Sequence, residues 1–172
     1  MNETLKNLTE RRSCRSYKPD PVPAEILDRI LEAGTYAASG MGRQSAIMIA
    51  VTDKKTRDQL SKMNADVMGA ATDPFYGAPV VIVVLADRSV GTYLYDGSLV
   101  MGNLMNAAHA LGIASCWIHR AKEEFDSDEG KAILKELGIE GDYEGIGHCI
   151  LGYAAQEEKP AAPRKDNFIF RI

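Results

Sequence analysis

The chain has 172 residues, of which 45% are hydrophobic and 26% are charged. This length and apolar content suit a single globular domain over residues 1–172 and exclude a disordered or fibrous protein. The formal net charge of −4 argues against a nucleic-acid partner, because the one dense group of basic residues is small and local.

The three cysteines are far apart and form no C-x-x-C motif, so we expect neither a disulfide framework nor a zinc site. A reducing cytoplasm is therefore the predicted location. The first residues lack the apolar segment of a secretory signal, and no apolar run approaches the roughly 20 residues of a membrane span. We expect neither export nor a membrane partner.

Helical and strand patterns alternate in the first half of the chain. Apolar residues at helical spacing, proline near a helix start and an aspartate cap indicate the boundaries. The predicted elements are a short helix around Leu5 and Leu8, a helix from Pro23 to Gly34, a strand over 46–52, a helix over 54–67 and an irregular loop over 69–76. A loop of that length often serves function.

The second half continues the alternation. The predicted elements are a strand over 80–86, a helix over about 92–111, a strand over 113–118, a helix from Asp126 or Ser127 to Gly138, and a strand over 147–153. Continuous apolar runs mark these strands as buried on both faces. His109 and His148 are predicted to be packed core histidines, and no close His/Asp/Glu spacing supports a metal site.

The helix over 92–111 is the most apolar, and we expect it at the centre of the fold. Its core face is predicted to carry Leu99, Val100, Leu104, Ala107, Ala108 and Leu111. Its small residues would also let another helix approach closely, as a dimer interface requires, although ordinary internal packing explains them equally well.

These elements predict an α+β sandwich with a mixed central sheet of four to five strands flanked by helices. A proline-rich change of composition follows residue 156, and the chain then ends in apolar residues around Phe168 and Phe170. Such residues need a surface to cover them, so we expect this C-terminal tail to extend to a partner subunit.

The run Arg11–Tyr17 places three guanidinium groups within seven residues. Each group can grip phosphate with two donors, and together they repel one another unless an anion lies between them. A solvated basic end of the first helix explains the run equally well. The run alone does not decide between the two.

Four motifs in order resemble the nitroreductase family of FMN-dependent oxidoreductases, in its compact branch. They are the runs 11–17, 37–44 and 111–119, and the sequence Leu151-Gly152-Tyr153 followed by Lys159-Pro160 and Arg164-Lys165. The resemblance covers nearly the whole chain. It implies bound FMN, NADH or NADPH as a transient electron donor, and a homodimer with shared flavin sites.

The resemblance also implies a set of cofactor-binding residues. Cations and a hydroxyl would come from Arg11, Arg12, Ser13 and Arg15, with Arg15 near the pyrimidine edge of the flavin and Arg164 and Lys165 closing on the phosphate. The opposite subunit would contribute Ala38, Ser39, Gly40, Gly42 and Gln44. The backbone of Trp117, Ile118, His119 and Arg120 would pass the flavin N5 atom.

One departure from the family concerns the residues after Gln44. The family commonly has proline and an aromatic residue there, whereas this chain has Ser45 and Ala46. We expect this replacement to open one wall of the site. No side chain is predicted to be catalytic, and His119 in particular is not assigned as a general acid, because the flavin supplies the redox chemistry.

The implied activity is a ping-pong transfer of hydride from NAD(P)H through flavin N5 to a flat acceptor such as a nitroaromatic or quinone. No G-x-G-x-x-G motif follows a strand, so no separate dinucleotide-binding domain is expected. Three alternatives stay open: a non-catalytic FMN-binding storage or sensor protein, a phosphate-recognising interaction module without a cofactor, and a related dehalogenase-type or flavin-fragmenting activity.

Overall fold

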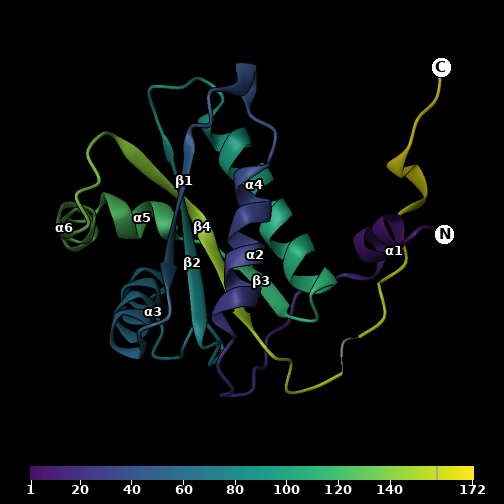
Figure 1. Ribbon diagram of the computed structural model, residues 1–172, viewed down its shortest axis with the longest axis horizontal. Coiled ribbons are helices and arrows are strands. Elements are labelled where there is room, and N and C mark those ends of the chain that lie inside the picture. Colours follow the sequence, from purple (N-terminus) through teal and green to yellow (C-terminus); the bar gives the residue numbers. More distant parts are fainter. Residues whose placement is uncertain (158) are drawn as a thin grey trace.

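The computed structural model describes residues 1–157 and 159–172. A four-stranded sheet lies between two layers of helices (Figure 1). The strands are β1 (Ala46–Val51), β2 (Val80–Asp87), β3 (Ala114–Ile118) and β4 (Tyr143–Gly152). The helices are α1 (Glu3–Glu10), α2 (Ala24–Thr35), α3 (Lys54–Met68), α4 (Tyr93–Ala110), α5 (Ala121–Asp126) and α6 (Asp128–Glu136), with 3₁₀ turns η1 (Gly40–Gly42) and η2 (Asp166–Phe168). The predicted α+β sandwich is confirmed.

The strand order is β1-β2-β4-β3, and all three strand pairs are antiparallel. The sequence predicted a mixed sheet, but an apolar run reports burial on both faces and carries no information about strand direction. At the outer edge of β3, a parallel isolated bridge joins Ser13 to Ser115. This bridge brings the basic run 11–15 to the sheet.

The sheet separates two hydrophobic clusters, and β2 contributes to both. Val80, Ile82 and Val84 face the layer formed by α2 and α4. Val81, Val83 and Leu85 pack in the opposite cluster with Leu60 and Phe125 and other residues of α3, α5 and α6. Each fully buried aliphatic side chain contributes roughly 1.5–3 kcal/mol. Strand β2 is therefore buried on both faces, as its apolar run predicted, and β2 rather than helix α4 is at the centre of the core.

Helix α4 lies against the sheet through Val100, Leu104 and Ala108, which are buried as predicted. Leu99, placed on the same face by the sequence, is instead 49% exposed, as are Leu94 and Tyr95 at 46% and 73%. One side of α4 thus presents large apolar side chains to solvent.

The segment before α6 differs from its prediction. Ser127 is the N-cap of α6, but the short helix α5 precedes it and was missed. Helix α5 carries few apolar residues and is held by close packing on β4, where a Cβ at Gly145 would strike the Ala121 carbonyl. Strand β4 likewise begins at Tyr143 rather than residue 147, because Glu144 and Gly145 have no strand signature.

The two histidines predicted in the core have different surroundings. His148 is fully buried, and its Nε2 lies 2.7 Å from Glu124 Oε2. His109 is only half-buried and its Nδ1 lies 2.6 Å from Asn7 Oδ1, so that prediction was wrong. Its position near the end of α4 lets it hold α1 instead of filling the core.

The loop over 69–76 is anchored by Asp73. This carboxylate accepts hydrogen bonds from Arg57, Ser61, Phe75 and Gly77. These contacts hold its pKa below the ordinary value even though burial opposes ionisation. The loop is therefore held against α3 by Asp73, while most of its residues are exposed.

The C-terminal tail is exposed and extends away from the sheet beside α1 (Figure 1). Phe168 is 65% exposed and Phe170 is 81% exposed. That the tail covers a partner subunit stays a prediction. Among the helices of the described residues, none has the combination of length and apolar character needed to cross a bilayer.

Candidate functional site

The basic run at residues 11–15 is fixed along the outer edge of β3. The Cys14 amide donates to the Ser115 carbonyl at 2.9 Å. Further along, the Lys18 amide donates to the Tyr153 carbonyl, and the Ala155 amide donates to the Ser16 carbonyl. The run is therefore part of the folded body and not a frayed helix end, which favours a binding role over a solvated one.

Three buried polar atoms at this edge have no hydrogen-bond partner among the described residues: Arg11 Nη1, Arg12 Nε and Ser115 Oγ. Arg12 uses its Nη1 to bond the Thr9 and Arg11 carbonyls at 2.8 and 2.7 Å, so its side chain is already oriented. A buried cationic donor without an acceptor is costly, and a bound anion would satisfy it. The donor set thus fits a phosphorylated ligand such as FMN.

The charges of Arg11 and Arg15 affect the pKa of a cysteine in strand β3. Burial raises the pKa of the Cys116 thiol, and the nearby charges of Arg15 and Arg11 oppose this rise. Arg11 and Arg15 therefore act on one small region at the β3 edge. Ser13 and Arg15 are both exposed, so their side chains are accessible to a ligand.

The turn after β3 has a strained backbone. Arg120 has φ 78°, a left-handed conformation that costs a non-glycine residue about 1–2 kcal/mol. Asn64 of α3 holds the turn: its Nδ2 donates to the His119 carbonyl at 2.8 Å, and its Oδ1 accepts from Arg120 Nε at 3.0 Å. Ile118 is buried, whereas the His119 side chain is exposed. This agrees with a role for the backbone here.

Trp117 points to the opposite side of β3 from Cys116 and Ile118. It packs at the edge of the hydrophobic cluster that contains α4. Its indole ring lies against Gly147, so closely that a Cβ added to Gly147 would clash with the ring. The structure therefore gives Trp117 a packing role in the core of its own chain.

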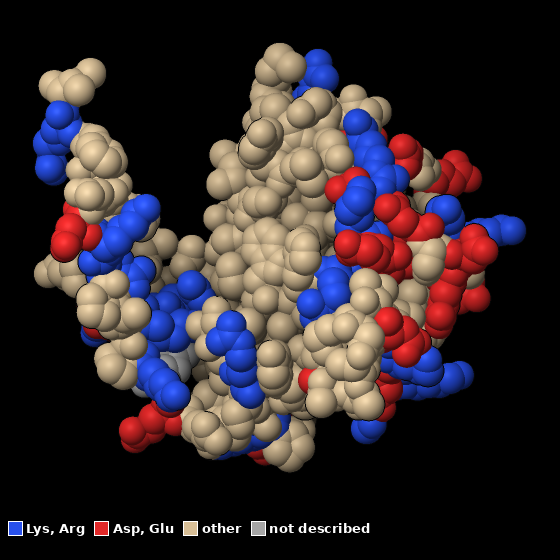
Figure 2. All heavy atoms as spheres, turned by 180° about the vertical axis from the view of Figure 1, so that it is seen from behind, with Lys and Arg blue, Asp and Glu red and all other residues tan. Residues whose placement is uncertain are grey.

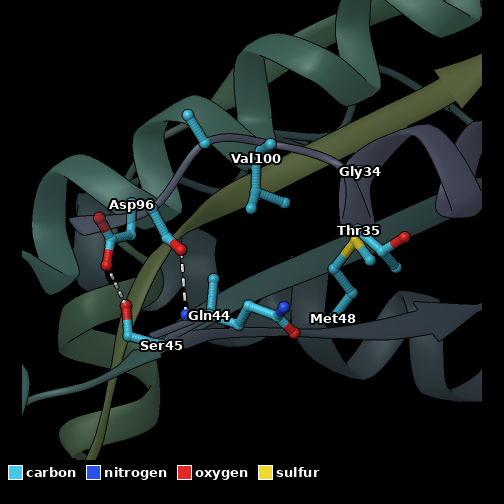
Figure 3. A pocket seen from close by; sticks show the side chains of 11 residues that line it. Gly34, Thr35, Gln44, Ser45, Met48, Asp96 and Val100 are labelled. Carbon is cyan, nitrogen blue, oxygen red and sulfur yellow. Dashed lines mark hydrogen bonds between the residues drawn. The ribbon is translucent and has the colours of Figure 1, made fainter. Parts of the chain in front are cut away.

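The loop at residues 37–44 is organised by Asp96, a carboxylate that is 3% exposed. Its oxygens accept hydrogen bonds from the Gly40 amide at 2.9 Å, the Ser45 hydroxyl at 2.7 Å and the Thr92 hydroxyl at 3.0 Å. Burial opposes ionisation, but these bonds hold the pKa of Asp96 below its ordinary value. Figure 3 shows Asp96 bonded to Ser45 on one wall of a pocket.

Several residues of this loop adopt positive φ, namely Met41 at 54°, Gly42 at 66° and Gln44 at 50°. The Gln44 amide donates to Ser39 Oγ at 3.0 Å, which closes the turn (Figure 3). A Cβ at Gly40 would clash with the Thr92 side chain, so only glycine allows the loop to approach α4 this closely. Met41, Gly42 and Gln44 are exposed at its tip.

A hollow of about 140 Å³ lies beside this loop. Its lining includes Ala38, Ser39, Gln44, Ser45, Ala46 and Met48. Ser45 and Ala46 line this hollow with small side chains, and Ser45 donates to Asp96. That they open a wall of a flavin site stays a prediction.

A single chain keeps the loop and the basic run apart. The loop precedes β1 and the run borders β3, which are the opposite edges of the sheet, three strand spacings or about 14 Å apart. They also lie at opposite ends of α4: the loop bonds Asp96, whereas Asn7 of α1 bonds the Asn106 carbonyl, about 15 Å further along the helix. Figure 1 shows the same separation.

The two cations of the tail are also outside this cluster. Arg164 bonds the Ala162 carbonyl, and Lys165 lies over the Phe168 ring at 5.3 Å. Both side chains are exposed. The structure thus places Arg11, Arg12, Ser13 and Arg15 along the edge of β3 and the 118–120 turn at the end of the same strand, whereas the loop and the tail lie elsewhere.

Two residues that organise the site had not been identified from the sequence. Asp96 is the one acidic residue inside the most apolar helix, which is a signal that could have identified it. Asn64 lies among the polar residues of a charged helix and gave no such signal. In the described part of the chain, no group of three or more His, Cys, Asp or Glu side chains could hold a metal ion.

Comparisons with known proteins agree with this geometry. The sequence profile of the nitroreductase family matches residues 8–75 and 67–153. An Archaeoglobus fulgidus protein, provisionally named NADH dehydrogenase/NAD(P)H nitroreductase, is 32% identical over 92% of this chain and 89% of its own length. The FMN reductase [NAD(P)H] of Bacillus subtilis is 39% identical over 67% of this chain. The matches to the Bacillus protein and to a Methanothermobacter thermautotrophicus relative span only 53% and 60% of those relatives.

Solved structures give the same result over the full length. A Bacteroides fragilis nitroreductase with bound FMN has a TM-score of 0.90 and 28% identity, with 100% of both chains covered. A Desulfitobacterium hafniense nitroreductase with bound FMN has a TM-score of 0.88 and 32% identity, again with 100% of both chains covered.

Proposed function

The chain belongs to the nitroreductase family, and from this premise we propose that residues 1–172 form one FMN-binding domain that acts as an NAD(P)H-dependent oxidoreductase. The observation that carries the proposal concerns Arg11 and Arg12 at the β3 edge: each has a buried guanidinium nitrogen that finds no hydrogen-bond partner among the described residues. These donors need an anion, and the strained turn at Arg120 lies at the end of the same strand.

The chain's own residues have separable tasks in binding FMN. Arg11, Arg12 and Ser13 bind the phosphate end, Arg15 supplies positive charge near the pyrimidine edge of the flavin, and the backbone of 117–120 borders its redox-active centre. Arg164 and Lys165 add positive charge at the phosphate. Ala38, Ser39, Gly40, Gly42 and Gln44 supply a close backbone wall, for which the small residues leave room.

FMN, when bound, would supply the redox chemistry, which would carry a hydride from NADH or NADPH to a flat acceptor such as a nitroaromatic or a quinone in a ping-pong sequence. The protein binds and orients the reactants. The exposed His119 side chain is not required to move a proton, because solvent reaches the same position.

The site is shared by two subunits of a homodimer. The separation between the basic run and the loop at 37–44, which one chain keeps on opposite edges of its sheet, supports this arrangement. Figure 2 supports the proposal: a broad hollow separates the arm formed by the chain ends from the main body, and the body's wall of this hollow is largely free of charged side chains. The exposed apolar residues of α4 and the tail are suited to a second copy of the chain.

The test is the visible spectrum of the purified protein, followed by anaerobic addition of NADH and of NADPH in separate stopped-flow experiments. We expect a bound flavin that is bleached rapidly by at least one nicotinamide. A flavin that is bound but not bleached would support a storage or sensor protein instead. A colourless protein that does not take up added FMN would contradict the proposal.

A further inference from the structure

The peptide between His119 and Arg120 is held from inside the protein by one side chain. Asn64 of α3 is completely buried, and it makes both of its strong hydrogen bonds to this turn. Its Nδ2 donates to the His119 carbonyl at 2.8 Å, and its Oδ1 accepts from Arg120 Nε at 3.0 Å. No other side-chain bond to the turn from α3 is present in the described residues.

The chemistry of the two partners explains why the residue is asparagine. A carbonyl only accepts hydrogen bonds and a guanidinium only donates them, so the side chain between them needs one donor and one acceptor. Aspartate would offer acceptors alone at neutral pH, and an aliphatic residue would offer neither. The two partners also fix which end of the Asn64 amide is nitrogen.

The hydrogen bond to His119 determines where the next amide points. The His119 carbonyl and the Arg120 N–H belong to one trans peptide unit, in which the two groups point in opposite directions. Because the carbonyl is turned inward to Asn64, the Arg120 N–H is turned outward, away from α3. Within residues 1–157 and 159–172, neither backbone nor side chain accepts a hydrogen bond from it.

We propose that Asn64 is a positioning residue for the flavin: by fixing the His119–Arg120 peptide, it aims the Arg120 amide outward as a hydrogen-bond donor to the flavin's hydride-accepting edge. This inference rests on the proposed function, because it assigns a purpose to a turn that borders the flavin. The left-handed φ of 78° at Arg120 shows that the turn is held in a conformation the chain would not choose alone.

The experiment compares three variants of the FMN-loaded protein. Asn64→Ala removes both hydrogen bonds, and Asn64→Asp removes the donor to His119 while keeping an acceptor for Arg120. The matched control is Asn103→Ala. In the wild type, the Asn103 side chain of α4 donates a hydrogen bond to the Ala33 carbonyl of α2 at 2.9 Å, and the substitution removes this bond. The readouts are the ¹⁵N resonance of N5 in ¹⁵N-labelled FMN, the anaerobic rate of flavin bleaching by the nicotinamide, and the melting temperature.

Both Asn64 variants should shift the N5 resonance towards that of a flavin without a donor at N5, and should slow bleaching by about ten- to hundredfold. The control should lower the melting temperature less than Asn64→Ala does, because it removes one hydrogen bond and not two, and should leave the N5 resonance and the rate unchanged. Asn64→Asp should melt closer to the wild type, because its pair with Arg120 persists.

An N5 resonance and bleaching rate equal to those of the wild type in either folded Asn64 variant would overturn the inference. So would a failure of both variants to fold, because Asn64 would then be needed for the fold as a whole. A wild-type protein that binds no FMN, or whose flavin neither nicotinamide reduces, would instead defeat the proposed function, and this inference with it.

Discussion

The side chain of Arg11 indicates that the ligand is an anion, because one of its guanidinium nitrogens needs a hydrogen-bond acceptor. Its Nη1 is buried, and residues 1–157 and 159–172 offer it no acceptor. Removing the guanidinium in Arg11→Ala should therefore raise the dissociation constant of FMN by one to two decades, which corresponds to the loss of a charge-assisted bond of about 1.5–3 kcal/mol. Equilibrium titration of the apoprotein with FMN measures this effect.

Arg164→Ala should weaken FMN binding less than Arg11→Ala, because Arg164 lies on the exposed tail and is not pre-positioned. Matched controls are Arg29→Ala for Arg11 and Arg171→Ala for Arg164, since both are exposed arginines outside the assigned site. Equal affinity in the Arg11 and Arg29 variants would remove the phosphate assignment.

A substitution at His119 tests whether the turn after β3 acts through its backbone or through the imidazole side chain. We expect His119→Ala to keep most of its hydride-transfer rate when saturated with FMN, because the proposed contribution of the turn comes from main-chain atoms. Loss of a general acid typically costs about 10²-fold or more, so a drop of that size with flavin still bound would make the imidazole catalytic. Stopped-flow bleaching over a range of pH distinguishes the two outcomes.

At this scale the sequence offered candidates for the ligand-facing residues, which stay predictions, but it did not identify the residues that hold their loops and turns in place. The crowded arginines at 11–15 left an anion site and a solvated helix end equally open, and the resemblance to the family favoured the anion site. Asn64 and Asp96 act through hydrogen bonds to distant backbone atoms, and such bonds depend on tertiary contacts between α3 or α4 and remote turns. A linear sequence does not display those contacts.

At the scale of elements, the loop at 37–44 depends on the charge of one buried carboxylate. The pKa of Asp96 is lowered because the bonds from Ser45, Gly40 and Thr92 outweigh the effect of burial. A group with a lowered pKa in the folded state stabilises the fold above its unfolded pKa and loses that contribution as pH falls through the folded value. The loop should therefore be weakened by acid.

We expect Asp96→Asn to lower the free energy of unfolding by about 1.5–3 kcal/mol at neutral pH. The difference from the wild type should shrink as pH falls below the ordinary range of an aspartate, where the wild-type carboxylate is also protonated. Urea denaturation at neutral and acidic pH measures both quantities. A difference that is constant with pH would show that the carboxylate charge does not hold the loop.

The elements with a strong pattern were the ones predicted correctly. Helix α3 and strand β2 have a cap or a continuous apolar run, and their predicted bounds agree closely with the structure. Helix α5 and the start of β4 are held by their contact with each other, through Gly145 against Ala121. Neither carries enough apolar residues to reveal itself, so tertiary packing decides their structure.

For the whole molecule, the chain is expected to work as a homodimer in which the tail covers its partner. Deleting residues 166–172 should weaken dimerisation and release FMN together, because the apolar side chains of the tail could contribute roughly 1.5–3 kcal/mol each when buried. Sedimentation of the truncated protein beside its flavin content tests this. A flavin-loaded monomer would refute the shared site.

Subunit mixing tests the shared site most directly. Arg11→Ala disables the basic run, and Gly40→Ala disables the loop, because its Cβ would clash with Thr92. We predict that the homodimer of either variant binds FMN weakly. A mixed dimer contains one subunit of each variant, so one of its two sites carries both substitutions and the other site carries neither. Tight FMN binding and nicotinamide-dependent bleaching should reappear on mixing. If neither returns although mixed dimers form, the two elements serve the same site from one chain, and the shared-site account is contradicted.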